Sequence, residues 1–203
     1  VSELVKTKRN LLDQGAVSRE VTVLFSDIRG FTTLSEARTP EQVVAILNRY
    51  FSKQVEVVFR HQGTVDKFIG DCIMAFWGAP VADPDQAKHA VAAALEMGRV
   101  LEEFRKDLGD LSEVFDIGVG IHTGKAVVGF MGSENKLDYT AIGDTVNLAS
   151  RIEGQTKGVG RVLVSSATRE ACGDAFDFVE KGTYKVKGRE QPVQLFEPRE
   201  KKA

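Results

Sequence analysis

Residues 21–33 form the stretch VTVLFSDIRGFTT, in which an apolar run ends at a carboxylate and a glycine. The run is rich in β-branched and aromatic residues, which predicts a strand buried on at least one face. Asp27 stands at the carboxyl end of this strand, and Gly30 turns the chain into a helix that starts at Phe31. The first N–H groups of a helix lack intrahelical acceptors, so this junction is suited to binding a phosphate.

Asp27 has two interpretations on this stretch alone. A carboxylate beside a phosphate is typical of a Mg²⁺ site, because Mg²⁺ takes one or two protein carboxylates plus substrate phosphate oxygens. A turn or helix-cap residue at the end of a strand would occupy the same position without any metal. Both interpretations stay open until a second carboxylate is found.

The composition is that of a globular domain, with 203 residues, 42% hydrophobic and 28% charged. The net charge of −2 argues against nucleic acid as the main partner. No apolar run approaches the roughly 20 residues that a membrane helix needs. Cys72 and Cys172 have neither metal-ligand spacing nor a disulfide pattern, so we expect a cytoplasmic location.

The chain starts at Val1 and shows no signal-peptide pattern, so we expect a segment of a longer polypeptide. Residues 1–18 are charged and are expected to connect to an N-terminal regulatory region, with a helix around residues 4–12. Residues 19–198 are expected to form one domain, and residues 199–203 a tail.

Local signals predict the elements of this domain. A capping box at Thr39-Pro40-Glu41-Gln42 starts a long helix that stops before Gly63. Strands at 64–69 and 72–77 form a hairpin with Gly70-Asp71 at its tip. The further expected elements are a helix that Asp83-Pro84-Asp85 opens and that ends near Gly109, a second hairpin over 115–131 that turns at Thr123-Gly124, a strand at 139–142, a helix over 146–153 capped by Asp144, a strand at 161–165, and helix-free strands over 176–196.

This order of elements predicts an α+β fold. We expect a ferredoxin-like sandwich in which helices pack on one face of a mostly antiparallel sheet, with a small C-terminal α/β extension.

Asp71 is the second carboxylate. A charged residue at a hairpin tip is usually only solvated. Together with Asp27, however, it would allow two divalent ions about 3.5–4 Å apart, as in two-metal phosphoryl-transfer sites. Asn147 and Arg151 are four residues apart on a predicted helix and so project from one face. Taken alone, Asn147 would make a hydrogen bond at the start of the helix, and Arg151 would form a surface ion pair with a residue such as Glu153.

Three blocks of the sequence resemble the catalytic domain of class III nucleotidyl cyclases. They are FSDIRGFT at 25–32, DKFIGDCIMAFWG at 66–78 and YTAIGDTVNLASRIE at 139–153, in the order and spacing of that family. The resemblance covers about residues 19–198. It implies a dimer in which each active site is shared between two subunits.

The resemblance also implies roles for individual residues. Asp27, Asp71 and the backbone carbonyl of Ile28 would hold two Mg²⁺ or Mn²⁺ ions, one activating the ribose 3′-hydroxyl and the other bridging the triphosphate. The N–H groups at the helix start would bind the phosphates of the substrate, and these belong to Gly30, Phe31 and Thr32.

Across the dimer, the resemblance implies that Lys67 and Thr140 recognise the base and that Asn147 orients the ribose. Arg151 would stabilise charge on the α-phosphate, and Lys187 would bind the triphosphate. Since one chain carries all these residues, a homodimer would hold two competent sites. His122 has no partner motif, so we assign it a structural role.

The base-recognition pair favours ATP. Guanylate cyclases would carry Glu and Cys at these two positions, and many adenylate cyclases carry Asp where this chain has Thr140. In having Thr at this position, the chain resembles the bacterial and soluble adenylate cyclase subgroup, whose members often respond to bicarbonate. The resemblance therefore implies conversion of ATP to 3′,5′-cyclic AMP and pyrophosphate.

Three other functions are retained as alternatives. A guanylate cyclase is the same class of enzyme with another base. A non-catalytic dimeric signalling module would be expected to have lost a metal carboxylate or Arg151, and this chain keeps them. A polymerase-like nucleotidyltransferase would leave Asn147 and Arg151 unexplained.

Overall fold

The computed structural model describes residues 15–109, 115–133, 135–187 and 189–201. The helix expected around residues 4–12 lies outside these ranges. The elements in chain order are β1 (Val17–Arg29), α2 (Phe31–Glu36), α3 (Pro40–Arg60), β2 (Thr64–Ile69), β3 (Cys72–Trp77), α4 (Gln86–Lys106), β4 (Asp116–Gly132), β5 (Leu137–Ile142), α5 (Asp144–Gly154), β6 (Val162–Ser165), α6 (Ser166–Cys172), β7 (Asp177–Tyr184) and β8 (Val193–Arg199).

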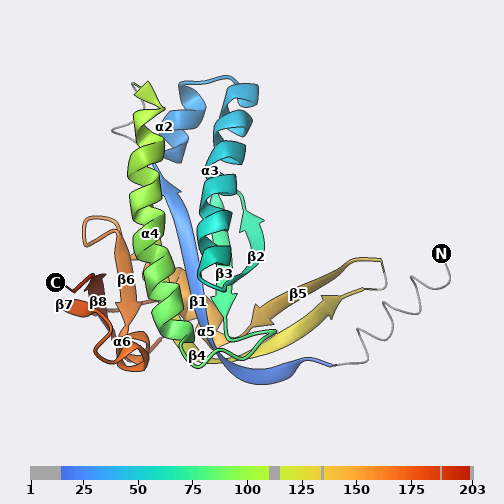
Figure 1. The fold of residues 1–203 in the computed structure, drawn as a ribbon, viewed down its shortest axis with the longest axis vertical. Coiled ribbons are helices and arrows are strands. Elements are labelled where there is room, and N and C mark those ends of the chain that lie inside the picture. Colours follow the sequence, from blue (N-terminus) through green and yellow to red (C-terminus); the bar gives the residue numbers. More distant parts are fainter. Residues whose placement is uncertain (1–14, 110–114, 134, 188, 202–203) are drawn as a thin grey trace.

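The strands form one sheet in the order β2-β3-β1-β4-β6-β8-β7, with β5 also paired to β4. All pairs are antiparallel except β4 with β6. The long helices α3 and α4 lie side by side across one face of this sheet (Figure 1). The expected α+β class, with its mostly antiparallel sheet, is confirmed.

The larger core lies between the sheet and the two long helices. Alternate residues of β1, among them Leu24 and Ile28, point to this face and pack with Tyr50 of α3. Helix α4 buries small residues, including Ala90 and Ala94, which allow its backbone to come close to the strands. The capping box predicted at the start of α3 is present, with Thr39 and Gln42 bonded reciprocally.

Helix α5 packs against the opposite face of the sheet. There it shares a second core with the other alternate residues of β1, including Val23 and Phe25. Two glycines of β4 make this approach possible, because a Cβ added to Gly120 would lie 2.1 Å from the backbone nitrogen of Glu153. The helix that carries Asn147 and Arg151 is therefore held tightly against the central strands.

The second hairpin expected over 115–131 is wrong, because β4 runs unbroken from Asp116 to Gly132. Residues from Val17 to Arg29 of β1 pair along its length, including Thr22 with Thr123 and Val21 with Gly124. The Oγ1 atoms of Thr22 and Thr123 lie 3.0 Å apart. Continuous pairing with β1 thus overrides the local turn signal of Thr123-Gly124.

Smaller differences concern boundaries. Strand β1 already begins at Val17, and Arg29 is still part of it. Helix α6 has no counterpart among the expected elements. Asp144 does not cap α5, because the N-cap is Gly143 and Asp144 lies in the first turn. In the described part of the chain, we find no helix with the length and apolar character needed to cross a membrane.

Candidate active site

The fold brings Asp27 and Asp71 into direct contact. Ser26 of β1 pairs with Ile73 of β3, which sets the tip of the β2–β3 hairpin beside Asp27. Burial raises the pKa of Asp27, repulsion from Asp71 raises it further, and the Ile28 backbone partly offsets both. The two side chains lie in half-buried positions and are less exposed than the sequence predicts.

This pair of carboxylates fits a divalent cation. Two acids held together away from bulk water repel each other, and a bound cation removes that repulsion. Among the described residues there is no group of three or more His, Cys, Asp or Glu side chains arranged for a metal. Further ligands would therefore come from backbone oxygens such as the Ile28 carbonyl and from a substrate, a donor set typical of Mg²⁺ and Mn²⁺ sites.

A pocket of about 300 Å³ opens beside the carboxylates. It lies between the end of β1 and the end of α5, and its lining includes Asp27, Gly30, Glu153 and Lys157. Gly30 has a left-handed backbone with φ of 77°, which glycine adopts without strain, and α2 begins at the next residue as predicted. Phe31 is half-buried, and Thr32 is exposed.

Glu153 belongs to this site, although the sequence alone assigns it no role there. Burial raises its pKa to about 7, and the negative charges of Asp27 and Asp71 contribute in the same direction. One sequence signal could have found it. Glu153 lies four residues after Ala149 and eight after Thr145, so this acid continues the buried stripe of α5.

We expect Glu153→Gln to stabilise the metal-free protein at alkaline pH. The folded-state pKa lies above the ordinary value of 4.5, so stability is lost as pH rises from about 4.5 to about 7. A neutral glutamine avoids that loss. Solvent screening limits the gain, so the midpoint of thermal unfolding in EDTA should rise by about 2–4 °C at pH 8. At pH 4 it should change little, and an equal shift at both pH values would contradict the assignment.

Lys67 and Thr140, which are far apart in sequence, meet at Asp66. The Thr140 hydroxyl donates to Asp66 Oδ2 at 2.5 Å. The Lys67 Nζ atom lies 3.3 Å from Asp66 Oδ1, and the Asp66 side chain is fully buried. The sequence alone assigns no role to Asp66. The structure thus assembles the expected base-recognition pair around a third residue.

Asn147 and Arg151 lie on α5 as predicted, the first exposed and the second half-buried. The ion pair considered between Arg151 and Glu153 does not occur among the described contacts, since Glu153 faces the carboxylates. Neither Arg151 nor Lys67 is among the groups that shift the pKa of Asp27.

Lys187 lies exposed on the segment between β7 and β8. Arg189, two residues further on, pairs with Asp144 in the first turn of α5. This contact ties the segment that carries Lys187 to the helix that carries Asn147.

His122 is part of a buried polar cluster. Its Nδ1 atom lies 2.7 Å from Ser165 Oγ, and burial lowers its pKa to about 4. A neutral imidazole hydrogen-bonded to a core hydroxyl agrees with the structural role assigned from the sequence.

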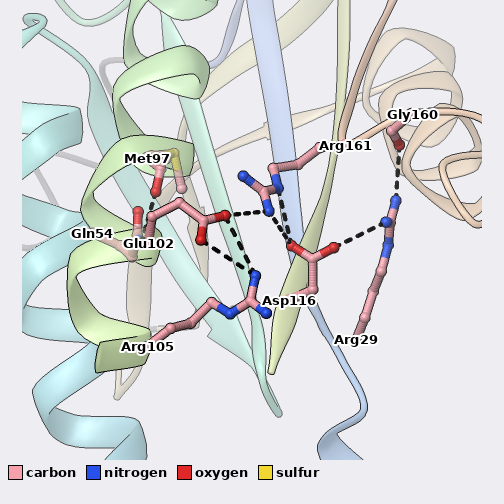
Figure 2. A network of polar contacts seen from close by, with 8 residues as sticks. All are labelled: Arg29, Gln54, Met97, Glu102, Arg105, Asp116, Gly160 and Arg161. Carbon is pink, nitrogen blue, oxygen red and sulfur yellow. Dashed lines mark hydrogen bonds and ion pairs between the residues drawn. The ribbon is translucent and has the colours of Figure 1, made fainter. Parts of the chain in front are cut away.

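A polar network anchors the strand end next to Asp27 (Figure 2). Arg29 donates to Asp116 at 3.4 Å and to the Gly160 carbonyl at 2.8 Å. Asp116 also accepts from Arg161 at 2.9 Å, and Arg161 reaches Glu102 of α4 at 2.6 Å. The end of β1 is therefore braced against β4, the start of β6 and α4.

Comparison with known proteins identifies the class. The family described as adenylate and guanylate cyclase catalytic domain matches residues 15–196. The chain belongs to this family, which confirms the resemblance seen in the sequence.

Two solved structures and one curated relative are especially similar. Adenylate cyclase 1 of Rhizobium meliloti is 47% identical to this chain. The match covers 91% of this chain and 28% of that protein. The adenylyl cyclase CyaB from P. aeruginosa superposes with a TM-score of 0.86 and 34% identity, covering 92% of this chain and 97% of that one. The guanylyl cyclase Cya2 has a TM-score of 0.85 and 41% identity, covering 91% and 93%.

Proposed function

We propose that this domain is an adenylate cyclase. It converts ATP to 3′,5′-cyclic AMP and pyrophosphate by attack of the ribose 3′-hydroxyl on the α-phosphate, at sites shared across a homodimer. The observation that carries the proposal is the joint presence of a carboxylate pair for metal, Asp27 with Asp71, and a base-reading pair, Lys67 with Thr140.

Overall similarity does not select the base, because the similar proteins include both an adenylate and a guanylyl cyclase. The base-reading pair supports adenine. Guanylate cyclases are expected to carry Glu and Cys at these positions, and this chain carries Lys67 and Thr140. We therefore place guanylate cyclase activity second.

Different residues of the chain have different roles in this reaction. Asn147 orients the ribose so that its 3′-oxygen lies in line with the α-phosphorus, and Arg151 neutralises the charge that grows on the α-phosphate. Lys187 and the N–H groups at Gly30, Phe31 and Thr32 hold the phosphates. Two Mg²⁺ or Mn²⁺ ions, bound by Asp27, Asp71 and the Ile28 carbonyl, would supply Lewis-acid activation of the hydroxyl.

A homodimer is supported by an exposed apolar surface on α3 and the β2 strand. Phe59 is 60% exposed, Phe68 47% and Ile69 53%, and Phe68 stacks on Phe51 of α3 with ring centroids 4.4 Å apart. Large apolar side chains exposed close together often mark a contact with another protein. A second copy of the chain would cover it and could bring its Lys67 and Arg151 to the carboxylate pair of the first.

We infer that this domain is part of a longer cytoplasmic protein, whose other regions regulate it. The chain spans 28%, 9% and 38% of the first three curated relatives that it matches. A regulatory region N-terminal to Val17 would reach the site through β1, whose far end carries Asp27.

We expect bicarbonate to raise turnover, a proposal based on Thr140 and the subgroup that it resembles. Cyclic AMP formation would be measured with sodium bicarbonate or sodium chloride at fixed pH and ionic strength. A higher rate with bicarbonate supports the proposal, and equal rates remove it.

Exchange of the base-reading pair should change nucleotide choice. We expect Lys67→Glu with Thr140→Cys to lower the ATP-to-GTP ratio of kcat/KM by about 10²-fold or more, because polar groups built for one purine are left unpaired against the other. Products would be identified after incubation with ATP or GTP and Mg²⁺ or Mn²⁺. An unchanged ratio would show that other residues read the base. Absence of any cyclic nucleotide from the wild type would favour the non-catalytic signalling module.

A further inference from the structure

Asp66 occupies an irregular position in β2. Val65 pairs with Ala75 and Lys67 with Met74, so the pairing shifts at Asp66 and leaves it as the extra residue of a β-bulge. Bulges re-aim side chains and are frequent beside active sites. Here the side chain of Asp66 points into the protein and is fully buried, whereas 43% of the Lys67 side chain is exposed.

The buried carboxylate contacts both residues of the base-reading pair. Its Oδ2 atom accepts from the Thr140 hydroxyl at 2.5 Å and from the Ala141 N–H at 3.4 Å. Its Oδ1 atom lies 3.3 Å from Lys67 Nζ and has no hydrogen bond within the described residues. Asp66 thus joins strands β2 and β5, which are not neighbours in the sheet.

These contacts fix the direction of the Thr140 hydroxyl. An ionised carboxylate only accepts hydrogen bonds, so Thr140 gives its one proton to Asp66. The oxygen of Thr140 is then left with lone pairs alone and acts as an acceptor toward a ligand. A hydroxyl without such a partner would rotate to suit either kind of ligand.

An acceptor at this position distinguishes the two purines. Adenine presents a 6-amino donor, and guanine presents a 6-oxo acceptor. Lys67 is a donor only, and its ammonium suits the unprotonated N1 of adenine better than the N1–H of guanine. With Asp66 in place, Thr140 and Lys67 together match adenine and oppose guanine.

We propose that Asp66 is a positioning residue that sets the preference for adenine by committing the proton of Thr140. The inference rests on the proposed cyclase function. It assigns part of the base selectivity to a residue that lies behind the two that face the substrate.

The test compares kcat/KM for ATP and GTP in Asp66→Asn. An asparagine of the same shape lacks the charge and can turn either its amide oxygen or its NH₂ toward Thr140, so the hydroxyl is no longer committed to donating its proton. We expect the ATP-to-GTP ratio to fall by about tenfold, which corresponds to about 1.4 kcal/mol. A variant that is only less stable would lose activity on both nucleotides equally and keep the ratio.

Asp138→Asn is the matched control, because Asp138 lies on β5, the strand of Thr140, with 54% of its side chain exposed. This control should keep the wild-type ratio. Asp66→Ser is made in parallel, and thermal unfolding shows which Asp66 variant is folded. A folded Asp66→Ser variant that keeps the wild-type ratio overturns the proposal.

A second background tests whether Asp66 acts through Thr140. In Thr140→Val there is no hydroxyl to direct, so the effect of Asp66→Asn on the ratio should be much smaller than in the wild type. An equal effect in both backgrounds overturns the proposal. Failure of the proposed function is distinct, because the wild type itself would then form no cyclic AMP.

Discussion

Replacing Asp27 or Asp71 with asparagine is expected to lower cyclic AMP formation by more than about 10³-fold, because each change removes a metal-binding carboxylate. The two acids are in contact and repel each other, and this repulsion with burial raises the pKa of Asp27. Metal binding needs both carboxylates close together, which explains why the fold tolerates the unfavourable free energy of burying two charges that repel each other. Turnover of the purified variants would be measured with Mg²⁺ or Mn²⁺ in modest excess.

The same changes should leave the fold intact. The folded-state pKa of Asp27 is raised, so its ionisation destabilises the metal-free protein as pH rises above the unfolded value. Asp27→Asn removes that charge and should keep or raise the unfolding midpoint in EDTA at pH 8. Mn²⁺ affinity, measured by calorimetry with a non-cyclising 3′-deoxy analogue of ATP, should fall.

Glu20→Gln is the control for Asp27→Asn, because Glu20 is an exposed acid on the same strand. Its activity and Mn²⁺ affinity should match the wild type. Near-normal turnover in Asp27→Asn or Asp71→Asn would refute the two-metal assignment.

Mixing two inactive variants is expected to restore activity. Asp27→Asn removes a metal ligand from both sites of its homodimer, and Arg151→Ala removes the cation for the α-phosphate from both. In a mixed dimer, one site carries both lesions. The other pairs the intact acids of the Arg151→Ala chain with the intact arginine of the Asp27→Asn chain.

The expected recovery follows from symmetry. If subunits exchange freely in an equal mixture, half of the dimers are mixed and each has one good site of two, so activity should reach about a quarter of wild type. Exchange would be verified with differently tagged chains. A mixture that stays inactive despite exchange would place the whole site within one chain.

Much of the fold could be predicted because its signals are local. The capping box at Thr39 and Gln42 is satisfied by residues three apart, and the hairpin tip at Gly70 depends only on its flanking strands. Asp27 was placed near its strand end, since an apolar run followed by a glycine needs no distant information. These signals act between neighbours in the chain, so they survive without knowledge of the tertiary structure.

Other predictions failed where distant partners compete with local preference. Thr123-Gly124 has the composition of a turn, yet pairing with β1 extends β4 through both residues. Asp144 has the composition of an N-cap, yet its side chain pairs with Arg189. In both places, contacts with residues far away in the sequence decide the local structure.

By itself, the sequence determined the family, the α+β class and the candidate site residues from Asp27 to Lys187, because these follow from short motifs in a fixed order. Only the tertiary structure decided that Glu153 lies beside Asp27 and Asp71, and that the carboxylate of Asp66 contacts the base-reading pair. Asp66 and Glu153 lie at the ends of two of these motifs, but the sequence alone assigns neither a role. Each acquires its role through burial against another element, Asp66 at Thr140 of β5 and Glu153 beside Asp27 of β1, and burial is a property of the packed chain.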